Sequence, residues 1–173
     1  MENQRQETRV NVFIDVGWLL DGLRGQGLAW RLDYAALVER IAGDRSVSTK
    51  FAYLAPYPQE YYPKKTAANM ELMELMKSQG FETRTTEMQV RGGMYLDLGI
   101  DVLMTRDMFE QTIADSFDTA IIVGRRPTLA PVIEALQKQG KTVENAFFEY
   151  QADPSNLLRD AADSFFPLTL ALA

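Results

Sequence analysis

The sequence predicts an α/β fold with three layers, in which a mostly parallel central sheet carries helices on both faces. Two patterns indicate this architecture. Short β-branched or aromatic runs alternate with longer segments whose apolar residues recur at helical spacing. Three of the short runs lack polar residues at alternate positions, as is typical of parallel strands covered on both sides. The chain of 173 residues has the length of one domain with its own hydrophobic core.

The first third of the chain is expected to form two strands and a capped helix. Asp33 can cap the helix that follows it, and Gly43 can end that helix. Four glycines and a tryptophan between the first strand and this helix favour a loop. The expected elements are a strand over residues 10–14, a loop with a short helix over residues 16–28, a helix over residues 34–42 and a strand over residues 47–54.

The rest of the chain is expected to alternate between helices and strands. Pro63 suits the first position of a helix. Asp153 and Pro154 give a similar signal for the last helix. One face of the Pro63 helix is expected to be buried, namely Ala67, Met70, Met73 and Met76. The expected elements are a helix over residues 64–79, a strand over 81–90, a turn at 91–93, a buried helix over 100–109, a strand over 119–123, a tight turn over 124–128, a helix over 129–139, a strand over 142–148 and a helix over 154–162.

The expected organisation is a polar tail over residues 1–8, one domain over residues 9–167 and an apolar tail over residues 168–173. Residues 1–9 lack the apolar core of a signal peptide, and no apolar stretch approaches the length of a membrane span. We therefore expect a cytoplasmic protein without membrane contact. The apolar segment over residues 165–173 packs on the body, meets a second subunit in a homodimer, or marks a truncated longer chain.

The sequence contains neither cysteine nor histidine. This absence excludes thiolate and imidazole catalysis and every metal site built from Cys or His ligands. A bound metal would have to be a hard cation such as Mg²⁺ or Mn²⁺, held by oxygen atoms. The formal net charge of −6 disfavours a protein that holds nucleic acid mainly by neutralising phosphates. It leaves open an enzyme that touches nucleic acid locally.

The best candidates for a functional site directly follow predicted strands. Ligands of an open parallel sheet bind beyond the carboxyl ends of the strands, where the strand order reverses. Asp15 follows the first strand, and Arg125 and Arg126 follow the strand over residues 119–123. These strands are expected to be central neighbours, which would bring the three side chains together. Asp101, at the start of a predicted helix, is expected near them.

Each candidate also has a structural interpretation. Asp15 could cap a helix, although an Asp that ends a central strand favours function. Asp101 could complement the dipole of its helix. Arg125 and Arg126 could bind a phosphate at a helix N-terminus, or they could neutralise Asp15 and Asp101 as ion-pair partners. Asp107 lies about 120° around and about 9 Å along an ideal helix from Asp101, so both cannot hold one small ion. The structural interpretation of Asp107 is a surface ion pair, for example with Arg106 or Arg126.

A second group of residues admits two interpretations. Lys64 and Lys65 begin a helix beside Tyr57, Tyr61 and Tyr62. These residues could form a surface that stacks bases and holds phosphates. A solvated helix start beside core tyrosines is the interpretation we favour. No Gly-rich dinucleotide fingerprint follows the first strand and no P-loop is present, so NAD and ATPase functions are set aside.

Residues 12–15, 99–102 and 117–123 carry short motifs whose order and spacing can be compared with known families. Through these motifs the sequence resembles the NYN domain, the LabA-like branch of the PIN-like nuclease superfamily. Residues 12–15 resemble the opening strand of that family, which ends in a metal-binding Asp. Residues 99–102, followed by Asp107, resemble a Gly-Val-Asp-Val segment and its downstream Asp. Residues 117–123 resemble the strand before a second acidic cluster. The order and spacing carry the resemblance, together with shorter matches at residues 131–133, 140–143, 157–158 and 162–165.

The resemblance implies hydrolysis of phosphodiester bonds in single-stranded RNA, assisted by Mg²⁺ or Mn²⁺. The catalytic residues that it implies are Asp15, Asp101 and Asp107, of which Asp15 and Asp101 would hold the metal. Arg125, Arg126 and Trp18 are the expected contacts to the substrate and its phosphate.

The departures from the family pattern bear on activity. The family usually carries Ser-Gly-Asp-Ser-Asp where residues 124–128 are Gly-Arg-Arg-Pro-Thr, so two carboxylates are lost and two guanidinium groups are gained. Trp18 replaces an Asn of the family, and Leu98 replaces a common Lys. We therefore expect weak metal binding and weakened or lost hydrolysis, as in a pseudoenzyme. The alternatives are an inactive module that binds RNA or another anionic ligand, and an oligomeric regulatory protein.

Overall fold

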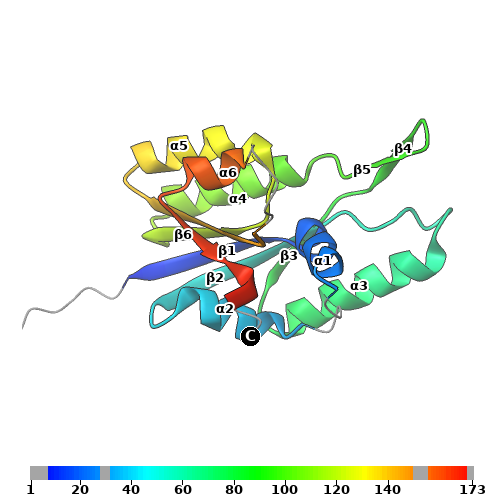
Figure 1. Cartoon of the computed structure of the whole chain (residues 1–173), viewed down its shortest axis with the longest axis horizontal. Coiled ribbons are helices and arrows are strands. Elements are labelled where there is room, and N and C mark those ends of the chain that lie inside the picture. Colours follow the sequence, from blue (N-terminus) through cyan, green and yellow to red (C-terminus); the bar gives the residue numbers. More distant parts are fainter. Residues whose placement is uncertain (1–7, 28–31, 150–155, 171–173) are drawn as a thin grey trace, which may run out of the picture.

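The computed structural model describes residues 8–27, 32–149 and 156–170. Its centre is a six-stranded sheet with the order β3-β2-β1-β6-β7-β8, in which every neighbouring pair is parallel. A separate antiparallel hairpin of β4 (Gln89–Arg91) and β5 (Met94–Leu96) projects away from the sheet (Figure 1). The strands of the sheet are β1 (Arg9–Asp15), β2 (Ser46–Leu54), β3 (Glu82–Thr85), β6 (Thr119–Val123), β7 (Thr142–Phe147) and β8 (Ser164–Pro167).

The helices divide between the two faces of the sheet (Figure 1). One face carries α1 (Val16–Gly25), α2 (Tyr34–Ala42) and α3 (Pro63–Ser78). The other carries α4 (Ile100–Ile113), α5 (Ala130–Lys138) and α6 (Leu157–Ala161). The 3₁₀ turns η1 (Pro127–Leu129) and η2 (Leu168–Leu170) complete the described elements. The predicted three-layer fold with a parallel central sheet is confirmed.

The central strands are buried on both sides because successive side chains point to opposite faces. On β1, Ile14 packs in the core beneath α1, α2 and α3, whereas Phe13 packs in the core beneath α4, α5 and α6. Phe13 stacks on Phe51 of β2, with ring centroids 5.1 Å apart. All residues of β6 are buried. This double burial explains why the central strands show no polar alternation.

Residues 16–28 were predicted as a loop with a short helix, but the helix α1 takes up most of this segment, so the loop was overestimated. Asp15 caps the helix by accepting a hydrogen bond from the backbone N–H of Trp18. Gly22 faces the core, where a Cβ atom would lie 2.3 Å from Cδ2 of Phe148. This glycine therefore allows the helix to approach the core closely, which offsets its intrinsic helix penalty of about 1 kcal/mol.

Most of the other helices and strands begin and end close to the predicted positions. Asp33 caps α2, as predicted, by accepting a hydrogen bond from the backbone N–H of Ala36. The face expected to be buried on α3 is only partly so, because Met73 and Met76 are buried whereas Met70 is 42% exposed. The helix lies against β2 and β3 near the edge of the sheet, where there is less to cover one whole face.

One further segment differs from expectation, and the C-terminal segment follows one of its three interpretations. The strand expected over residues 81–90 is divided between β3 and the hairpin, whose turn places Gly92 and Gly93 at positive φ values of 57° and 77°. The C-terminal segment pairs with the body, because β8 lies parallel to β7 and Leu168 is buried. The predicted helix start at Asp153 and Pro154 lies outside the described residues. Within those residues, no helix is both long and apolar enough to cross a membrane.

Candidate functional site

The order of the strands reverses between β1 and β6, which is where a doubly wound sheet binds its ligands. Ile14 pairs in register with Val123, so the next residues, Asp15 and Gly124, lie side by side at the carboxyl edge. A Cβ atom on Gly124 would lie 3.0 Å from Cβ of Asp15. Its φ of +153° also disfavours other residues. Gly124 thus leaves the room that the Asp15 side chain occupies.

Asp15 is 2% exposed and is held by two different elements. Its Oδ1 accepts the hydrogen bond from the N–H of Trp18 at 3.3 Å. Its Oδ2 accepts a hydrogen bond from Nε of Arg126 at 2.8 Å, and Nη2 of Arg126 lies 2.7 Å from the same oxygen. Asp15 therefore serves both as the cap of α1 and as one partner of a buried ion pair.

Arg126 bridges two carboxylates. Its Nη2 also donates to Oδ2 of Asp97 at 2.7 Å. The Arg126 side chain is 10% exposed, whereas that of Asp97 is 42% exposed. The bridge ties the end of β1 to the linker between the β4–β5 hairpin and α4. It therefore joins three segments that are far apart in the sequence through one guanidinium group.

Burial and charge act against each other at this bridge. Burial raises the pKa of the Asp15 carboxyl group, and the positive charge of Arg126 opposes that rise. Asp97 adds a smaller upward effect, because a second negative charge nearby disfavours ionisation of Asp15. In the other direction, the hydrogen bond to Asp97 and the negative charge of Asp15 help to raise the pKa of Arg126, although burial opposes the rise. The guanidinium group is thus fixed as a cation between two acidic side chains.

One interpretation of the two arginines paired them with Asp15 and Asp101. Arg126 does pair with Asp15, and its second partner is Asp97. Asp101 lies in the first turn of α4, where its carboxylate accepts a hydrogen bond from the N–H of Val102 at 3.1 Å. That contact fits its structural interpretation. A metal shared by Asp15 and Asp101 stays a prediction.

Asp107 is buried in a separate ion-pair cluster on α4. Its Oδ1 accepts hydrogen bonds from Nε and Nη2 of Arg106 at 3.0 and 2.7 Å. Its Oδ2 accepts one from the hydroxyl group of Tyr53 at 2.9 Å and lies 3.2 Å from Nε of Arg84. At 1% exposure, Asp107 is not the surface residue that its structural interpretation assumed. Both carboxylate oxygens of Asp107 are thus occupied by partners. Burial raises the pKa of the Tyr53 hydroxyl group, which therefore stays protonated.

A cavity of about 280 Å³ opens beside Asp15. Trp18 lines it and also packs edge-on against Phe147, with ring centroids 6.3 Å apart. Ile100 lines the cavity, whereas the neighbouring Asp101 does not belong to the lining. Arg125 is half-buried in the turn after β6 and is also absent from the lining. The described residues of the lining are Asp15, Gly17, Trp18, Leu20, Asp21, Arg24, Leu54, Ala55, Tyr57, Asn69, Met88, Tyr95, Asp97 and Ile100.

The carboxylates at this edge do not fit a divalent cation. In the described part of the chain, no group of three or more acidic side chains is placed to hold a metal ion. The two that meet, Asp15 and Asp97, share the guanidinium group of Arg126. Mg²⁺ binds through several oxygen ligands in near-octahedral geometry, and a fixed cation in contact with the same oxygens would repel it.

The fold and this edge define a class of protein: a parallel α/β domain with an acidic strand end at the point where strand order reverses. Residues 9–169 match the NYN domain family. The chain therefore belongs to that family, within the PIN-like nuclease superfamily. Nucleases of this family typically depend on a divalent metal, and NYN domains usually bind RNA.

The fold also has a counterpart among solved structures. A crystal structure of a protein of unknown function from Vibrio parahaemolyticus is similar to this chain, with a TM-score of 0.71 and 19% sequence identity. The similarity covers 96% of each chain. At this identity the likeness shows the fold alone. No curated protein matches the sequence.

Proposed function

We propose that this chain is a domain of the NYN ribonuclease family in which hydrolysis of phosphodiester bonds is weakened or lost. The observation that carries the proposal is the guanidinium group of Arg126, which lies within 2.8 Å of both Asp15 and Asp97. In metal-assisted hydrolysis, carboxylates hold an ion that activates water and stabilises the leaving oxygen. Here the carboxylate at the end of β1 is neutralised by a cation that belongs to the protein.

A guanidinium group cannot replace the metal in that chemistry. It supplies positive charge and hydrogen-bond donors, but it has no coordination position at which a water molecule could be deprotonated. A metal ion would first have to displace the buried Arg126 side chain from Asp15. Residual activity would therefore require this bridge to open. In that case Asp15 and Asp101 would hold the metal, with Asp107 as a supporting residue and with Trp18 and Arg125 at the substrate.

A cleavage assay tests the proposal. Labelled single-stranded RNA is incubated with Mn²⁺ and with the native chain, Asp15→Asn or Asp21→Asn. Asp21 is a matched control, because it lines the same cavity but forms an exposed pair with Arg24. We expect little or no product that depends on Asp15. Complete cleavage of the RNA by the native chain and by Asp21→Asn, but not by Asp15→Asn, would overturn the proposal.

Calorimetry with Mg²⁺ and Mn²⁺ gives an independent test. We expect no saturable heat that depends on Asp15, because Arg126 already neutralises its carboxylate. Saturable binding that Asp15→Asn abolishes would place a metal at this carboxylate and contradict the proposed loss of the metal site.

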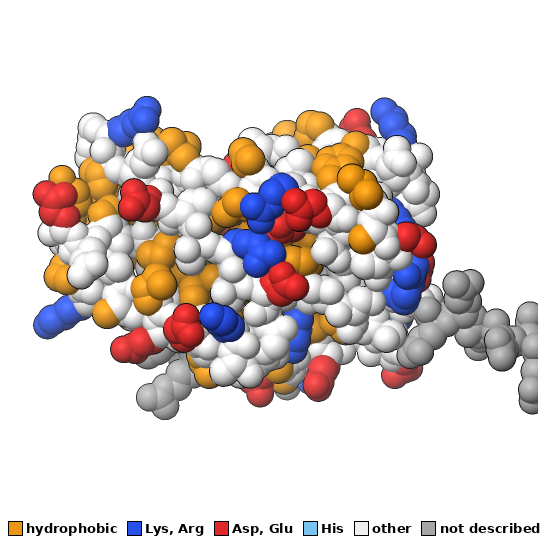
Figure 2. Space-filling model, turned by 180° about the vertical axis from the view of Figure 1, so that it is seen from behind, with side chains coloured by type: hydrophobic (Ala, Val, Ile, Leu, Met, Phe, Trp, Pro, Cys, Tyr) orange, Lys and Arg blue, Asp and Glu red, His pale blue; other side chains and the backbone are white. Residues whose placement is uncertain are grey.

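The second candidate function is an inactive module that binds RNA. It is favoured by the bridge itself, which fixes the shape of the edge without a metal, and by the RNA binding that is usual in this family. Acidic and basic side chains are interspersed over the face in Figure 2. RNA binding on this face would therefore not depend on a broad basic surface that neutralises phosphates. Homodimer formation, a role as an oligomeric regulator and a cytoplasmic location stay predictions; light scattering across a concentration series tests the first.

A further inference from the structure

Three tyrosines from two separate segments meet beside the candidate site, and we call them the tyrosine cluster: Tyr57, Tyr62 and Tyr95. Tyr57 and Tyr62 precede α3, whereas Tyr95 lies on β5 of the hairpin. The rings pack edge-to-face, with centroids 5.5 to 5.9 Å apart. A hydrogen bond joins the hydroxyl groups of Tyr62 and Tyr95. The cluster therefore links the projecting hairpin to the start of α3.

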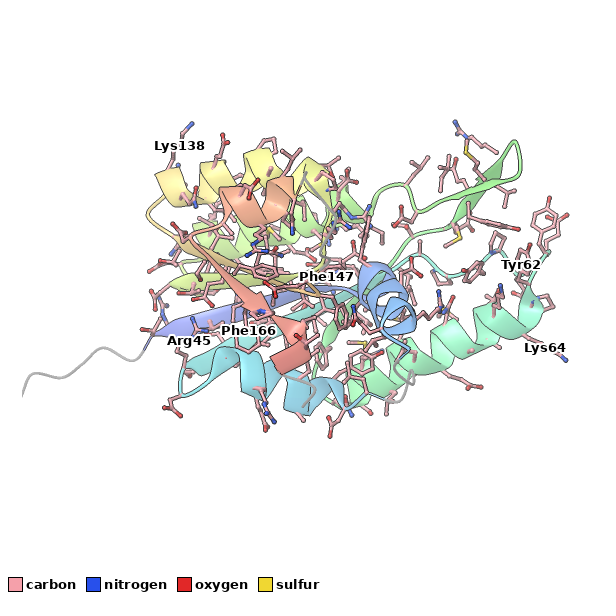
Figure 3. All side chains as sticks on the ribbon, viewed as in Figure 1. Arg45, Tyr62, Lys64, Lys138, Phe147 and Phe166 are labelled. Atoms are coloured by element: carbon pink, nitrogen blue, oxygen red, sulfur yellow. The ribbon has the colours of Figure 1, made fainter. Side chains whose placement is uncertain are left out.

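These rings are not part of the hydrophobic core, contrary to the interpretation favoured from sequence. Tyr95 is 43% exposed, and the adjacent Tyr61 is 59% exposed. Tyr57 and Tyr62 are half-buried. Figure 3 places Tyr62 and Lys64 at the outer end of α3, away from the sheet. Aromatic rings in such a position expose apolar faces to water at a cost that a stacking partner would remove.

A cation accompanies the rings. Nζ of Lys65 lies 4.7 Å from the ring centroid of Tyr57 and 4.9 Å from that of Tyr62. The side chain is held over both rings by cation–π attraction, and Lys65 is exposed, so its charge faces solvent beside the cluster. Aromatic faces next to a lysine are the combination that proteins use to hold single-stranded nucleic acid, with bases on the rings and phosphates near the cation.

The cluster is continuous with the site at the edge of the sheet. Tyr57 and Tyr95 both line the cavity of about 280 Å³ that also contains Asp15 and Trp18. A strand whose bases reach the cluster would therefore pass directly to the cavity. Because the net charge is −6, the protein as a whole repels phosphate groups. Stacking of bases on the rings therefore contributes more to binding here than phosphate contacts do.

We propose that the tyrosine cluster stacks the bases of single-stranded RNA and delivers the strand to the cavity beside Asp15. The proposal rests on the RNA binding considered above and assigns it to rings outside the acidic edge. Binding at the cluster depends on exposed base faces. It therefore selects unpaired RNA over duplex RNA, whose bases are already stacked on one another.

Fluorescence anisotropy with two labelled RNA strands of about twelve nucleotides tests this assignment. One strand is oligouridine, and the other has the same backbone with abasic positions. The variants are Tyr95→Phe, which keeps the ring, and Tyr95→Leu, which keeps an apolar side chain without an aromatic face. Ile113→Ala, at the far end of α4 and 85% exposed, is the surface control. Circular dichroism and the urea midpoint confirm that each variant is folded.

We expect the native chain, Tyr95→Phe and Ile113→Ala to bind oligouridine more tightly than the abasic strand. Tyr95→Leu should lose about tenfold in affinity for oligouridine, because it removes one aromatic face on which a base stacks, and a tenfold loss corresponds to about 1.4 kcal/mol. Its affinity for the abasic strand should not change. Equal oligouridine affinities for Tyr95→Leu and the native chain would overturn the role of the cluster while leaving RNA binding intact.

The failure of each proposal has its own signature. If the native chain binds neither strand, then RNA binding and the cluster's role are both rejected, whereas the proposed loss of hydrolysis is unaffected. If the native chain cleaves RNA in a manner that depends on Asp15, the proposed loss of hydrolysis is rejected, and the comparison of Tyr95→Phe with Tyr95→Leu still decides the role of the cluster. Tighter binding of an abasic strand than of oligouridine by the native chain would also reject stacking.

Discussion

Replacing Arg126 with methionine removes the guanidinium group but keeps most of the apolar length of the side chain. Asp15, at 2% exposure, then loses the cation that lies 2.7 Å from its carboxylate. Breaking a buried ion pair by removing one partner costs about 3–5 kcal/mol. Asp97 is half-exposed and regains water, so the cost arises from Asp15 alone. We expect a loss of about 3 kcal/mol in the free energy of unfolding at neutral pH.

The loss should depend on pH in a defined direction. Burial already raises the pKa of Asp15, and without Arg126 nothing of comparable strength opposes that rise. A carboxyl group whose pKa is higher in the folded state than in the unfolded state binds its proton more tightly when folded. The stability that this protonation supplies is present at low pH and is lost as pH rises through the folded-state pKa. The cost of Arg126→Met should therefore shrink as the solution is acidified.

Urea unfolding of four proteins at several pH values measures these effects. Asp15→Asn combined with Arg126→Met should recover most of the loss, because a neutral pair replaces the orphaned charge. Arg24→Met is the matched control, since its pair with Asp21 is exposed, and it should change stability by about 0.5 kcal/mol or less. The reasoning is refuted if Arg126→Met is as stable as the native chain at neutral pH. A loss that is independent of pH and is not reduced by Asp15→Asn would refute it equally.

Three further substitutions probe other contacts. Gly22→Ala should lower the unfolding free energy by about 1–3 kcal/mol in urea titrations, because its Cβ would overlap the buried Phe148 ring, despite the better helix propensity of alanine. Asp107→Ala should cost about 3 kcal/mol in the same measurement, since it leaves the hydroxyl group of buried Tyr53 without its acceptor and removes the partner of two arginines. Asp118→Asn should destabilise the protein at neutral pH but not in strong acid. The hydrogen bond from Arg9 lowers the pKa of Asp118 in the folded state. The contribution of Asp118 to stability is therefore present above the ordinary pKa of a carboxyl group and vanishes as pH falls through the lowered value. Parallel urea midpoints for the variant and the native chain across the acid range would contradict this last expectation.

Local signals in the sequence predicted most of the fold. The cap at Asp33 and the β-branched run before Gly124 act through their immediate neighbours, so they can be recognised without knowing the fold. The adjacency of β1 and β6 followed from their double burial, which only central strands have. The length of the helix α1 was underestimated because the packing of Gly22 against Phe148 connects residues that are far apart in the chain. Helix propensity alone predicts that Gly22 disfavours a helix.

The candidate site was predicted less completely than the fold. The position of Asp15 and its contact with an arginine follow from topology, since the ends of two neighbouring parallel strands must meet. Asp97 was not singled out, because it lies in an irregular linker after the hairpin, where no period or cap indicates what a side chain will face. The burial of Asp107 was missed for a similar reason, since it depends on Arg84 and Tyr53 from two other strands.

The geometry of Arg126 favours one of the two interpretations of that side chain. A phosphate ligand would need donors of Arg126 directed at a vacant position, but its Nε and Nη2 already meet Asp15 and Asp97 at 2.7 to 2.8 Å. An arriving phosphate would have to compete with two carboxylates, one of which is buried and would be left without a counter-charge. Because orphaning Asp15 costs about 3–5 kcal/mol, whereas a hydrogen bond to a charged group gains about 1.5–3 kcal/mol, Arg126 favours its contacts with Asp15 and Asp97 over phosphate binding. The guanidinium group of Arg126 therefore holds the carboxyl edge of the sheet together by joining Asp15 to Asp97.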